Sequence, residues 1–207
     1  MTDDRELDAT SWGDYYRHTL GRELRPPFVR AMHVLREAGI TPAQAVEVGF
    51  GDGEETLALL ADGWRVLAID ASPQAAEVLG PRVPAEIADR LEIRSTPAEE
   101  TVLPRFDFLY AGYTLPFLGA EAFGRFWAHA LDRANPGGYL AVNFFGPHDT
   151  WADRPNMQFH ERAKVERLVE GLDVVVLDET EEDGPSFLGP KHWHLFEVIA
   201  RKPSEQG

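Results

Sequence analysis

The sequence predicts an α/β fold: a doubly wound, seven-stranded, mostly parallel sheet with an antiparallel C-terminal strand and helices on both faces. Three observations lead to this prediction. Short apolar runs alternate with helical segments from residue 45 to residue 145, a glycine-rich turn directly follows the first of these runs, and no helix separates the last two runs. Strands that alternate with helices need crossover connections, which make neighbouring strands parallel.

The N-terminal region predicts a helix over residues 11–24 that Pro26 and Pro27 bring to an end, and a second helix over residues 28–39 that ends at Gly39. Apolar residues at helical spacing support both helices.

In the first helix, Trp12 and Tyr16 lie four positions apart and share one face, with Tyr15 beside them. Such an aromatic stripe usually packs in a core, but a helix that precedes the first strand can also fold over a cleft. We expect residues 1–207 to form a single domain with residues 1–27 as an N-terminal helical lid.

The central region follows the strand and helix pattern most clearly. Its apolar runs predict strands over residues 45–48, 65–69, 91–94, 106–111 and 139–145. Its segments with helical spacing, each bounded by Gly, Pro or Asp, are residues 54–62, 73–79 and 120–134. Asn135-Pro136-Gly137-Gly138 predicts a turn before the fifth strand.

The C-terminal region begins with residues 146–158, which are rich in Gly, Pro, Asp and Asn and predict a long loop. A loop of this length in a compact domain is often functional. A helix over residues 159–168 and strands over residues 173–177 and 192–200 follow, and the absence of an intervening helix predicts that these strands pair antiparallel. The acidic segment 178–190 between them is expected to be a solvated loop.

The first strand ends in the spaced motif Glu47-x-Gly49-x-Gly51-x-Gly53, and the second strand is followed by Asp70. Glycines allow a tight turn and the close approach of a ligand to the backbone. An acid about 20 residues further on can accept hydrogen bonds from ribose hydroxyls. An ordinary turn and a helix-capping Asp70 are the alternatives, but together the two features favour a nucleoside cofactor.

The glycine spacing distinguishes between two cofactors. A dinucleotide fingerprint, G-x-G-x-x-G, would need a glycine at Glu54, whereas the third glycine here is Gly53. The motif instead resembles the first motif of class I S-adenosylmethionine (SAM)-dependent methyltransferases. A nicotinamide-dependent oxidoreductase on a related fold remains an alternative, as does a non-catalytic SAM-binding module.

The resemblance extends beyond this motif. Asp107 and the Asn135-Pro136-Gly137-Gly138 turn also fall where these enzymes place later landmarks. The chain is most similar to the small bacterial tellurite-resistance-like methyltransferases, through Phe144-Phe145-Gly146, Asp149-Thr150-Trp151 and residues 156–160 and 191–194. The resemblance implies a Rossmann-like fold, SAM as the cofactor, and methyl transfer to a small-molecule acceptor by in-line displacement.

The resemblance also implies roles for individual residues. Glu47 would lie near the amino group of SAM, the glycine backbone along its methionine part, and Asp70 at its ribose, while aromatic lid residues suit its sulfonium cation. At the place where the family often has an acid for adenine, this chain has Thr96. The expected cofactor-binding residues are Glu47, Gly49, Gly51, Gly53, Asp70, Ala71, Pro97, Ala98, Tyr110, Trp12 and Tyr16.

Candidates for the acceptor side are fewer. Tyr113 and Phe117 follow the fourth strand and are expected to face the acceptor or to pack beneath the next helix. His18, His160 and Tyr113 are candidate catalytic groups, and His148 is a further candidate base, although no proton-transfer residue need dominate this reaction.

We expect no metal site. His192 and His194 share one face of a strand, but the sequence offers no cysteine and no local acid cluster to complete a coordination sphere.

Composition limits the partners. The 207 residues carry a formal net charge of −15, which opposes binding to nucleic acid or to an anionic membrane. The chain has no cysteine, no secretory signal core and no apolar run of membrane-spanning length, which leads us to expect a cytoplasmic protein. The sequence leaves the methyl acceptor and the oligomeric state open.

Overall fold

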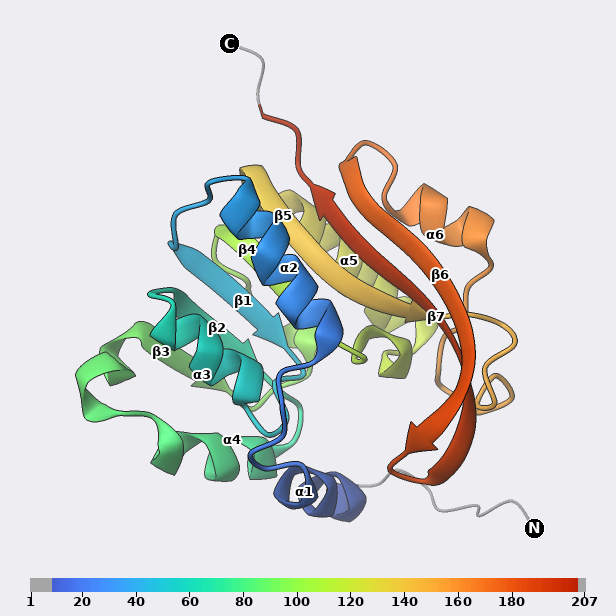
Figure 1. Ribbon diagram of the computed structural model, residues 1–207, viewed down its shortest axis with the longest axis horizontal. Coiled ribbons are helices and arrows are strands. Elements are labelled where there is room, and N and C mark those ends of the chain that lie inside the picture. The colour runs from blue at the N-terminus through green and yellow to red at the C-terminus, as the bar shows by residue number, and fades with distance from the viewer. Residues whose placement is uncertain (1–8, 205–207) are drawn as a thin grey trace.

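The computed structural model describes residues 9–204, which form one seven-stranded sheet in the order β3-β2-β1-β4-β5-β7-β6 (Figure 1). Strands β1 to β5 are parallel, whereas β7 pairs antiparallel with both β5 and β6. The strands are β1 (Gln44–Val48), β2 (Arg65–Ile69), β3 (Leu91–Arg94), β4 (Phe106–Ala111), β5 (Ala134–Phe145), β6 (Asp173–Ser186) and β7 (Gly189–Arg201). The predicted fold class is confirmed.

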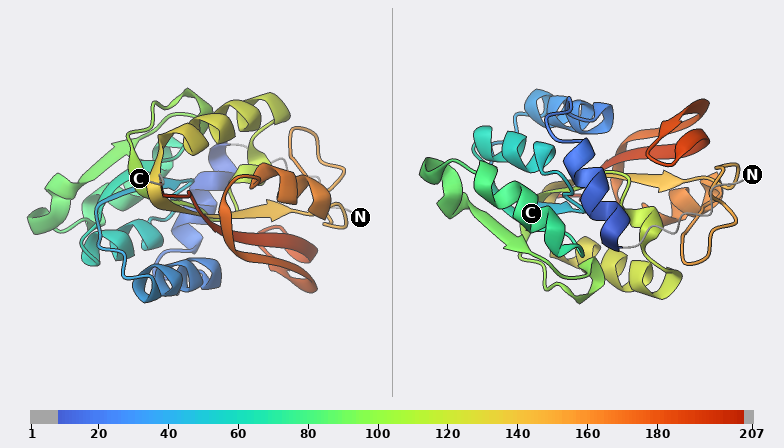
Figure 2. Two further views of the ribbon diagram at one scale, coloured as in Figure 1. Left: turned by 90° about the horizontal axis from the view of Figure 1, so that it is seen from above. Right: turned by 90° about the horizontal axis from the view of Figure 1, so that it is seen from below.

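Helices cover both faces of this sheet, with α2 and α3 on one side and α5 on the other (Figure 2). The α-helices are α1 (Ala9–His18), α2 (Pro26–Glu37), α3 (Glu54–Ala61), α4 (Pro73–Leu79), α5 (Ala120–Arg133) and α6 (Arg162–Leu168). Short 3₁₀ segments are η1 (Gly80–Arg82), η2 (Ala85–Arg90), η3 (Ala98–Glu100) and η4 (Leu115–Phe117). Within residues 9–204, none of these helices has the length and apolarity needed to cross a lipid bilayer.

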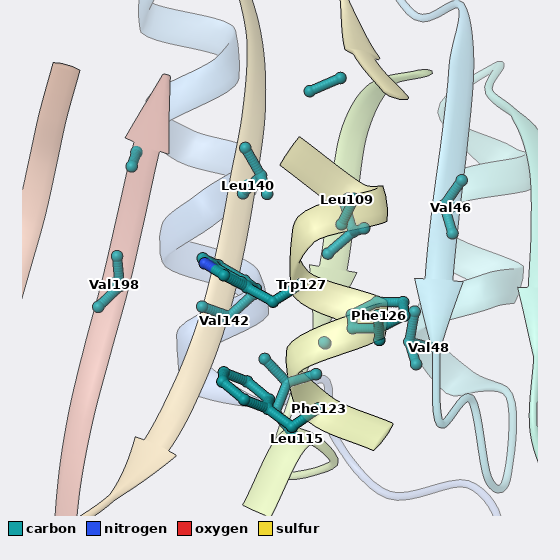
Figure 3. Packing of buried hydrophobic residues seen from close by; sticks show 14 of the residues in the cluster. Val46, Val48, Leu109, Leu115, Phe123, Phe126, Trp127, Leu140, Val142 and Val198 are labelled. Carbon is teal, nitrogen blue, oxygen red and sulfur yellow. The ribbon is translucent and has the colours of Figure 1, made fainter. Parts of the chain in front are cut away.

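The core forms two layers because successive strand side chains point to opposite faces. Val46 and Val48 of β1 belong to the layer beneath α5, where Phe126 lies beside Val48 and Trp127 beside Val142 of β5 (Figure 3), whereas Ala45 belongs to the layer beneath α2 and α3. With both faces covered, the central strands are mostly apolar rather than alternating. This burial produces the continuous apolar runs seen in the sequence.

The C-terminal hairpin differs from the prediction. Residues 178–186 continue β6 instead of forming a solvated loop, and the chain turns only at Phe187 and Leu188. Glu179 and Glu181 are paired with imidazoles of β7, so the acids do not simply repel one another. The prediction of an acidic loop was therefore wrong, because cross-strand pairing outweighs the local charge density.

Three smaller differences concern element ends. Helix α1 ends at His18 rather than at residue 24, and α6 begins at Arg162 because Phe159 instead bridges to Phe145. The expected turn at residues 135–138 is an irregularity inside β5, where Gly137 has a φ of 81°.

The topology determines where a site can form. The carboxyl ends of β1, β2 and β4 lie together at one edge of the sheet, and α1 lies across this edge (Figure 1). The tip of the β6–β7 hairpin bends toward the same edge. Ligands of open α/β sheets bind at this carboxyl edge.

Candidate active site

A cavity of about 1070 Å³ opens at the carboxyl edge of the sheet, between α1, the loops that follow β1, β2 and β4, and the β6–β7 hairpin. Most of the residues expected from the sequence line it. These are Trp12, Tyr16, His18, Glu47, Gly49, Gly51, Asp70, Ala71, Pro97, Ala98, Tyr110 and Tyr113. Gly53 and His160 do not line the cavity.

Asp70 connects three segments at one end of this cavity. Its carboxylate accepts hydrogen bonds from the Gly51 N–H (3.0 Å), the Ser72 N–H (2.9 Å) and the Tyr16 hydroxyl (3.2 Å). Burial raises the pKa of Asp70, and these hydrogen bonds oppose that rise. The result is a buried carboxylate with defined orientation at the tip of β2.

The three glycines of the motif all adopt positive φ, but for different reasons. A Cβ on Gly51 would lie 3.2 Å from the Tyr16 ring, and one on Gly49 would overlap the Thr114 side chain. A Cβ on Gly53 would lie 2.6 Å from Leu79 of α4, outside the cavity. Gly53 therefore serves helix packing, whereas Gly51 keeps the cavity open beside the lid.

Two polar groups lie buried deeper in the cavity. Glu47 accepts a 2.5 Å hydrogen bond from the Thr56 hydroxyl, and burial together with nearby Glu55 raises its pKa well above the ordinary value. The Tyr110 hydroxyl is buried and finds no hydrogen-bond partner within residues 9–204. Buried polar groups are normally paired, so the Tyr110 hydroxyl is available to a ligand.

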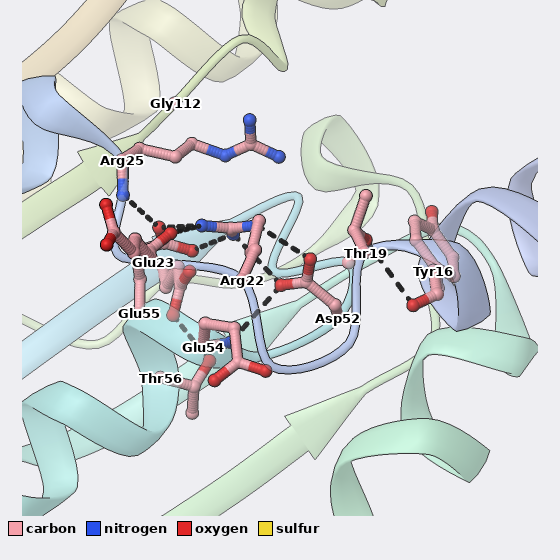
Figure 4. A network of polar contacts seen from close by, with 12 residues as sticks. Tyr16, Thr19, Arg22, Glu23, Arg25, Asp52, Glu54, Glu55, Thr56 and Gly112 are labelled. Carbon is pink, nitrogen blue, oxygen red and sulfur yellow. Dashed lines mark hydrogen bonds and ion pairs between the residues drawn. The ribbon is translucent and has the colours of Figure 1, made fainter. Parts of the chain in front are cut away.

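An arginine from the α1–α2 connection is inserted beside the glycine turn (Figure 4). The Arg22 guanidinium contacts Asp52 at 2.8 Å and Glu55 at 2.5 Å, and both carboxylates are almost fully buried. This network was not predicted from the sequence, because 30 or more positions separate Arg22 from its partners. The network fixes the connection that follows α1 against the start of α3.

Arg25 has a different role from Arg22. Its backbone N–H donates to Glu55, but its guanidinium extends away from that carboxylate (Figure 4). The guanidinium lines the cavity, donates to the Tyr15 hydroxyl at 2.8 Å and lies 5.3 Å from the centre of the Tyr113 ring. It forms no ion pair with any residue from 9 to 204. The role of Arg25 was also not predicted, although the sequence places it directly before Pro26 and Pro27, where α2 begins.

The opposite end of the cavity is an aromatic wall, which we define as Tyr113, Phe117, Phe145, Trp151 and Trp193. Neighbouring rings within it have centres 5.9–6.4 Å apart. Helix α1 joins the wall through Trp12, whose ring centre lies 5.3 Å from that of Phe117. The loop predicted over residues 146–158 contributes Trp151, so it does reach the cavity.

The candidate catalytic groups occupy very different surroundings. His18 is exposed at the cavity rim, and burial raises the pKa of the Tyr113 hydroxyl. His160 instead packs against Phe123 and Phe144 in the core, where burial lowers the pKa of its imidazole.

The histidines of the hairpin region are accompanied by acids, contrary to the sequence prediction. His148, Glu181 and His194 bring ligand-type atoms within 4.8 Å of one another, and His194 Nε2 lies 3.0 Å from Glu179. His194 Nδ1 accepts a hydrogen bond from the His148 N–H, so Nε2 carries the proton. In that tautomer Nε2 can donate to Glu179 but cannot bind a metal ion. The absence of a metal site stays a prediction.

Comparisons with known proteins were consistent with one another. The methyltransferase domain family matches residues 46–142. TehB from Haemophilus influenzae superposes with a TM-score of 0.72 at 16% identity, covering 92% of this chain and 67% of that one.

Two further solved structures are similar. The N-methyltransferase NodS from Bradyrhizobium japonicum, in complex with S-adenosyl-L-homocysteine (SAH), gives a TM-score of 0.66 at 17% identity, with 93% and 99% coverage. The 1,6-didemethyltoxoflavin-N1-methyltransferase from Burkholderia thailandensis gives 0.61 at 20% identity, with 97% and 93% coverage. No protein of curated function matches the sequence.

Proposed function

We propose that this chain is a class I SAM-dependent methyltransferase and that it transfers the methyl group to a small-molecule acceptor held at the aromatic end of the cavity. One observation carries the proposal: a single cavity joins the Asp70 end to the aromatic wall. The donor and the acceptor can therefore meet inside one cavity.

The nucleoside part of SAM fits the Asp70 end. The Asp70 carboxylate can accept hydrogen bonds from ribose hydroxyls in exchange for that of the Tyr16 hydroxyl. Pro97 and Ala98 line the adjoining wall, which suits the flat adenine ring. The left-handed turn at Gly51 gives the ligand access to the backbone.

The methionine part fits the buried polar groups further along. The unpaired Tyr110 hydroxyl and Glu47 suit the amino group, directly or through water. The Arg25 guanidinium suits the carboxylate, because it lines the cavity without an acid partner within residues 9–204. The N-terminus of helix α3 is less suited to this carboxylate. The helix begins with Glu54 and Glu55, whose negative charges offset the positive end of the helix dipole.

When bound, SAM supplies a methyl group that the acceptor lone pair attacks in line with the departing sulfur, so that SAH leaves with the carbon–sulfur bonding electrons. The protein's contribution is alignment, which can be worth up to about 7–11 kcal/mol when both reactants are held in near-attack geometry. Helix α1 and the β6–β7 hairpin line the cavity and reduce its exposure to solvent.

We assign no general base. The Tyr113 hydroxyl has a raised pKa and stays protonated near neutral pH, and the His160 imidazole lies outside the cavity. His18 lines the rim but is exposed to solvent. The acceptor would lose its proton to water or to a group of its own.

Calorimetric titration with SAH tests the donor site. We expect wild type to bind SAH and Asp70→Asn to bind it at least about 10-fold more weakly, because the carboxylate would lose a charge-assisted hydrogen bond to ribose. The exposed Asp89→Asn is the matched control. Equal affinity in Asp70→Asn would refute the ribose assignment.

A panel of small-molecule acceptors tests catalysis. SAH release, measured with each acceptor at saturating SAM, is expected for at least one of them. SAH binding without release across a broad panel would favour the non-catalytic SAM-binding alternative. The nicotinamide alternative lacks support, since the matching domain family is that of methyltransferases.

A further inference from the structure

A buried lysine lies behind the aromatic wall. Lys191 on β7 is 3% exposed and does not line the cavity. Its Nζ lies 3.5 Å from the ring centre of Trp151, 3.6 Å from that of Trp193 and 4.3 Å from that of Phe145.

The charge of Lys191 is balanced inside the protein. Its Nζ lies 2.9 Å from Asp149 Oδ1, an ion pair without an aligned hydrogen bond, and both side chains are buried. Asp149 also accepts hydrogen bonds from the Trp151 and His194 N–H groups, which fixes its carboxylate. The pair therefore holds the loop that carries Trp151 against the strand that carries Trp193.

Three rings around an ammonium group are the arrangement by which proteins recognise cationic ligands. Here the cation belongs to the chain itself. Trp151, Trp193 and Phe145 contact Lys191 and also line the cavity. Because Lys191 already draws on their π electron density, these rings attract a second cation less well, and the two positive charges would repel.

Two other positive charges near the wall act in the same direction. The Arg25 guanidinium lies over Tyr113 of the same wall, and the sulfonium of SAM adds a further positive charge. The apolar side chains Leu118, Ala122 and Leu195 complete this end of the cavity. Such surroundings suit stacking of a flat ring, because aromatic rings pack favourably in offset or edge-to-face arrangements.

We propose that the aromatic wall is the acceptor subsite and that it takes a flat aromatic ring carrying no positive charge. The proposal rests on the proposed methyltransferase function and specifies its substrate class. Glu99 and Glu182 also line the cavity, so an aromatic cation is the competing ligand class that the experiment must exclude.

Calorimetry on the protein saturated with SAH tests the ligand class. The probes are 2-naphthol, its saturated counterpart decahydro-2-naphthol, and protonated 2-naphthylmethylamine. We expect 2-naphthol to bind at least about 5-fold more tightly than either of the others, the difference expected from one or two ring contacts. Binding of the saturated or the cationic probe that equals or exceeds that of 2-naphthol overturns the proposal, as does binding of none of them.

Variants locate the subsite. Trp193→Leu should weaken 2-naphthol binding about 2- to 10-fold, the effect of losing one ring contact, and leave SAH affinity unchanged. Phe159→Leu is the control, since Phe159 packs against Phe145 but does not line the cavity. Unchanged 2-naphthol affinity in Trp193→Leu would place the ring elsewhere and contradict the proposal.

The double variant Lys191→Met/Asp149→Asn removes the internal cation together with its partner, which avoids leaving one buried charge alone. The preference for 2-naphthol over the cationic probe should shrink in this variant. An unchanged preference shows that Lys191 does not set the charge of the ligand and overturns that part of the proposal. If the double variant does not fold, the Trp193→Leu variant still tests where the subsite lies. Failure of the wild-type protein to bind SAH would instead refute the methyltransferase function itself.

Discussion

Gly51 lies between two side chains. Its N–H donates a hydrogen bond to the Asp70 carboxylate, and its Cα lies close to the Tyr16 ring. Its φ of 53° lies in the left-handed region, and a Cβ would lie 3.2 Å from Tyr16. Both conditions favour glycine at this single position. The residue therefore connects backbone conformation directly to the shape of the donor end of the cavity.

Gly51→Val is expected to lose measurable SAH binding, because a β-branched residue is strained at this φ and its side chain would push Tyr16 across the cavity. Calorimetry with SAH measures the loss. Gly80→Ala is a matched control, since Gly80 has helical backbone angles and open space around its Cβ position. A folded Gly51→Val variant with wild-type affinity would contradict this account of the turn.

Arg25→Met is expected to weaken SAH binding about 10-fold, the loss of one charge-assisted hydrogen bond to the methionine carboxylate. Folding should be little affected, because the guanidinium forms no ion pair within residues 9–204 and the methionine stem can still pack. Arg17→Met, at an exposed pair with Asp14, is the control. The assignment of Arg25 fails if both variants bind SAH equally well.

At the scale of elements, the α1–α2 connection is held by charge as well as by packing. Arg22 joins Asp52 and Glu55, and the Gly21 N–H donates to Glu54 at 2.7 Å. Helix α1 also contacts α4, where Gly13 lies against Gln74. Helix α1 and the connection that follows it are therefore docked against the glycine turn and α4.

Arg22→Met is expected to lower the free energy of unfolding by about 3 kcal/mol, because it leaves two buried carboxylates without their cation. Chemical denaturation measures the loss. Arg125→Met, which breaks an exposed pair with Glu121, should cost no more than about 1 kcal/mol. A similar loss in the two variants would mean that the Arg22 network contributes little to stability.

The sequence predicted the elements well where the local pattern and the tertiary environment agree. The bounds of β2, β3, β4 and α4 match the expected ranges, since each is an apolar run or helical segment between clear breakers. It failed at β6, where like charges stand next to one another along an exposed strand. Pairing with β7 makes that segment a strand, and the local sequence pattern does not reveal this pairing.

The site was predictable to a similar degree. The glycine spacing and Asp70 led to the end of the cavity that we propose for the donor, because the contacts there depend on the backbone and on strand order. Arg22 and Arg25 were missed because their roles depend on how the segment before β1 folds back over the sheet. The Lys191–Asp149 pair joins residues 42 positions apart, which spacing alone could not reveal.

At the scale of the whole molecule, the buried Lys191 ties stability to pH. Burial lowers its pKa from 10.5 to about 8, with Asp149 opposing the shift and Arg154 adding to it. Between these two pKa values the lysine holds a proton in the unfolded chain but not in the folded protein. The stability that this group contributes therefore rises with pH across that window, and it is lost as the pH falls through about 8.

Denaturation curves at intervals from pH 7 to pH 10 measure this effect. The difference in unfolding free energy between wild type and Lys191→Met/Asp149→Asn should move in favour of wild type as the pH rises. Comparing the two proteins cancels the contributions of the other titrating groups. A difference that is flat or moves in the opposite direction would show that Lys191 keeps its ordinary pKa in the fold.

The first helix and the last hairpin meet where both line the cavity. Tyr15 and Phe187 meet edge to face, with ring centres 5.1 Å apart. A pair of this kind contributes about 0.5–1.5 kcal/mol, at most a few times the thermal energy. The two segments should therefore part and rejoin readily, and reactants can enter and products leave through this gate while the sheet stays intact.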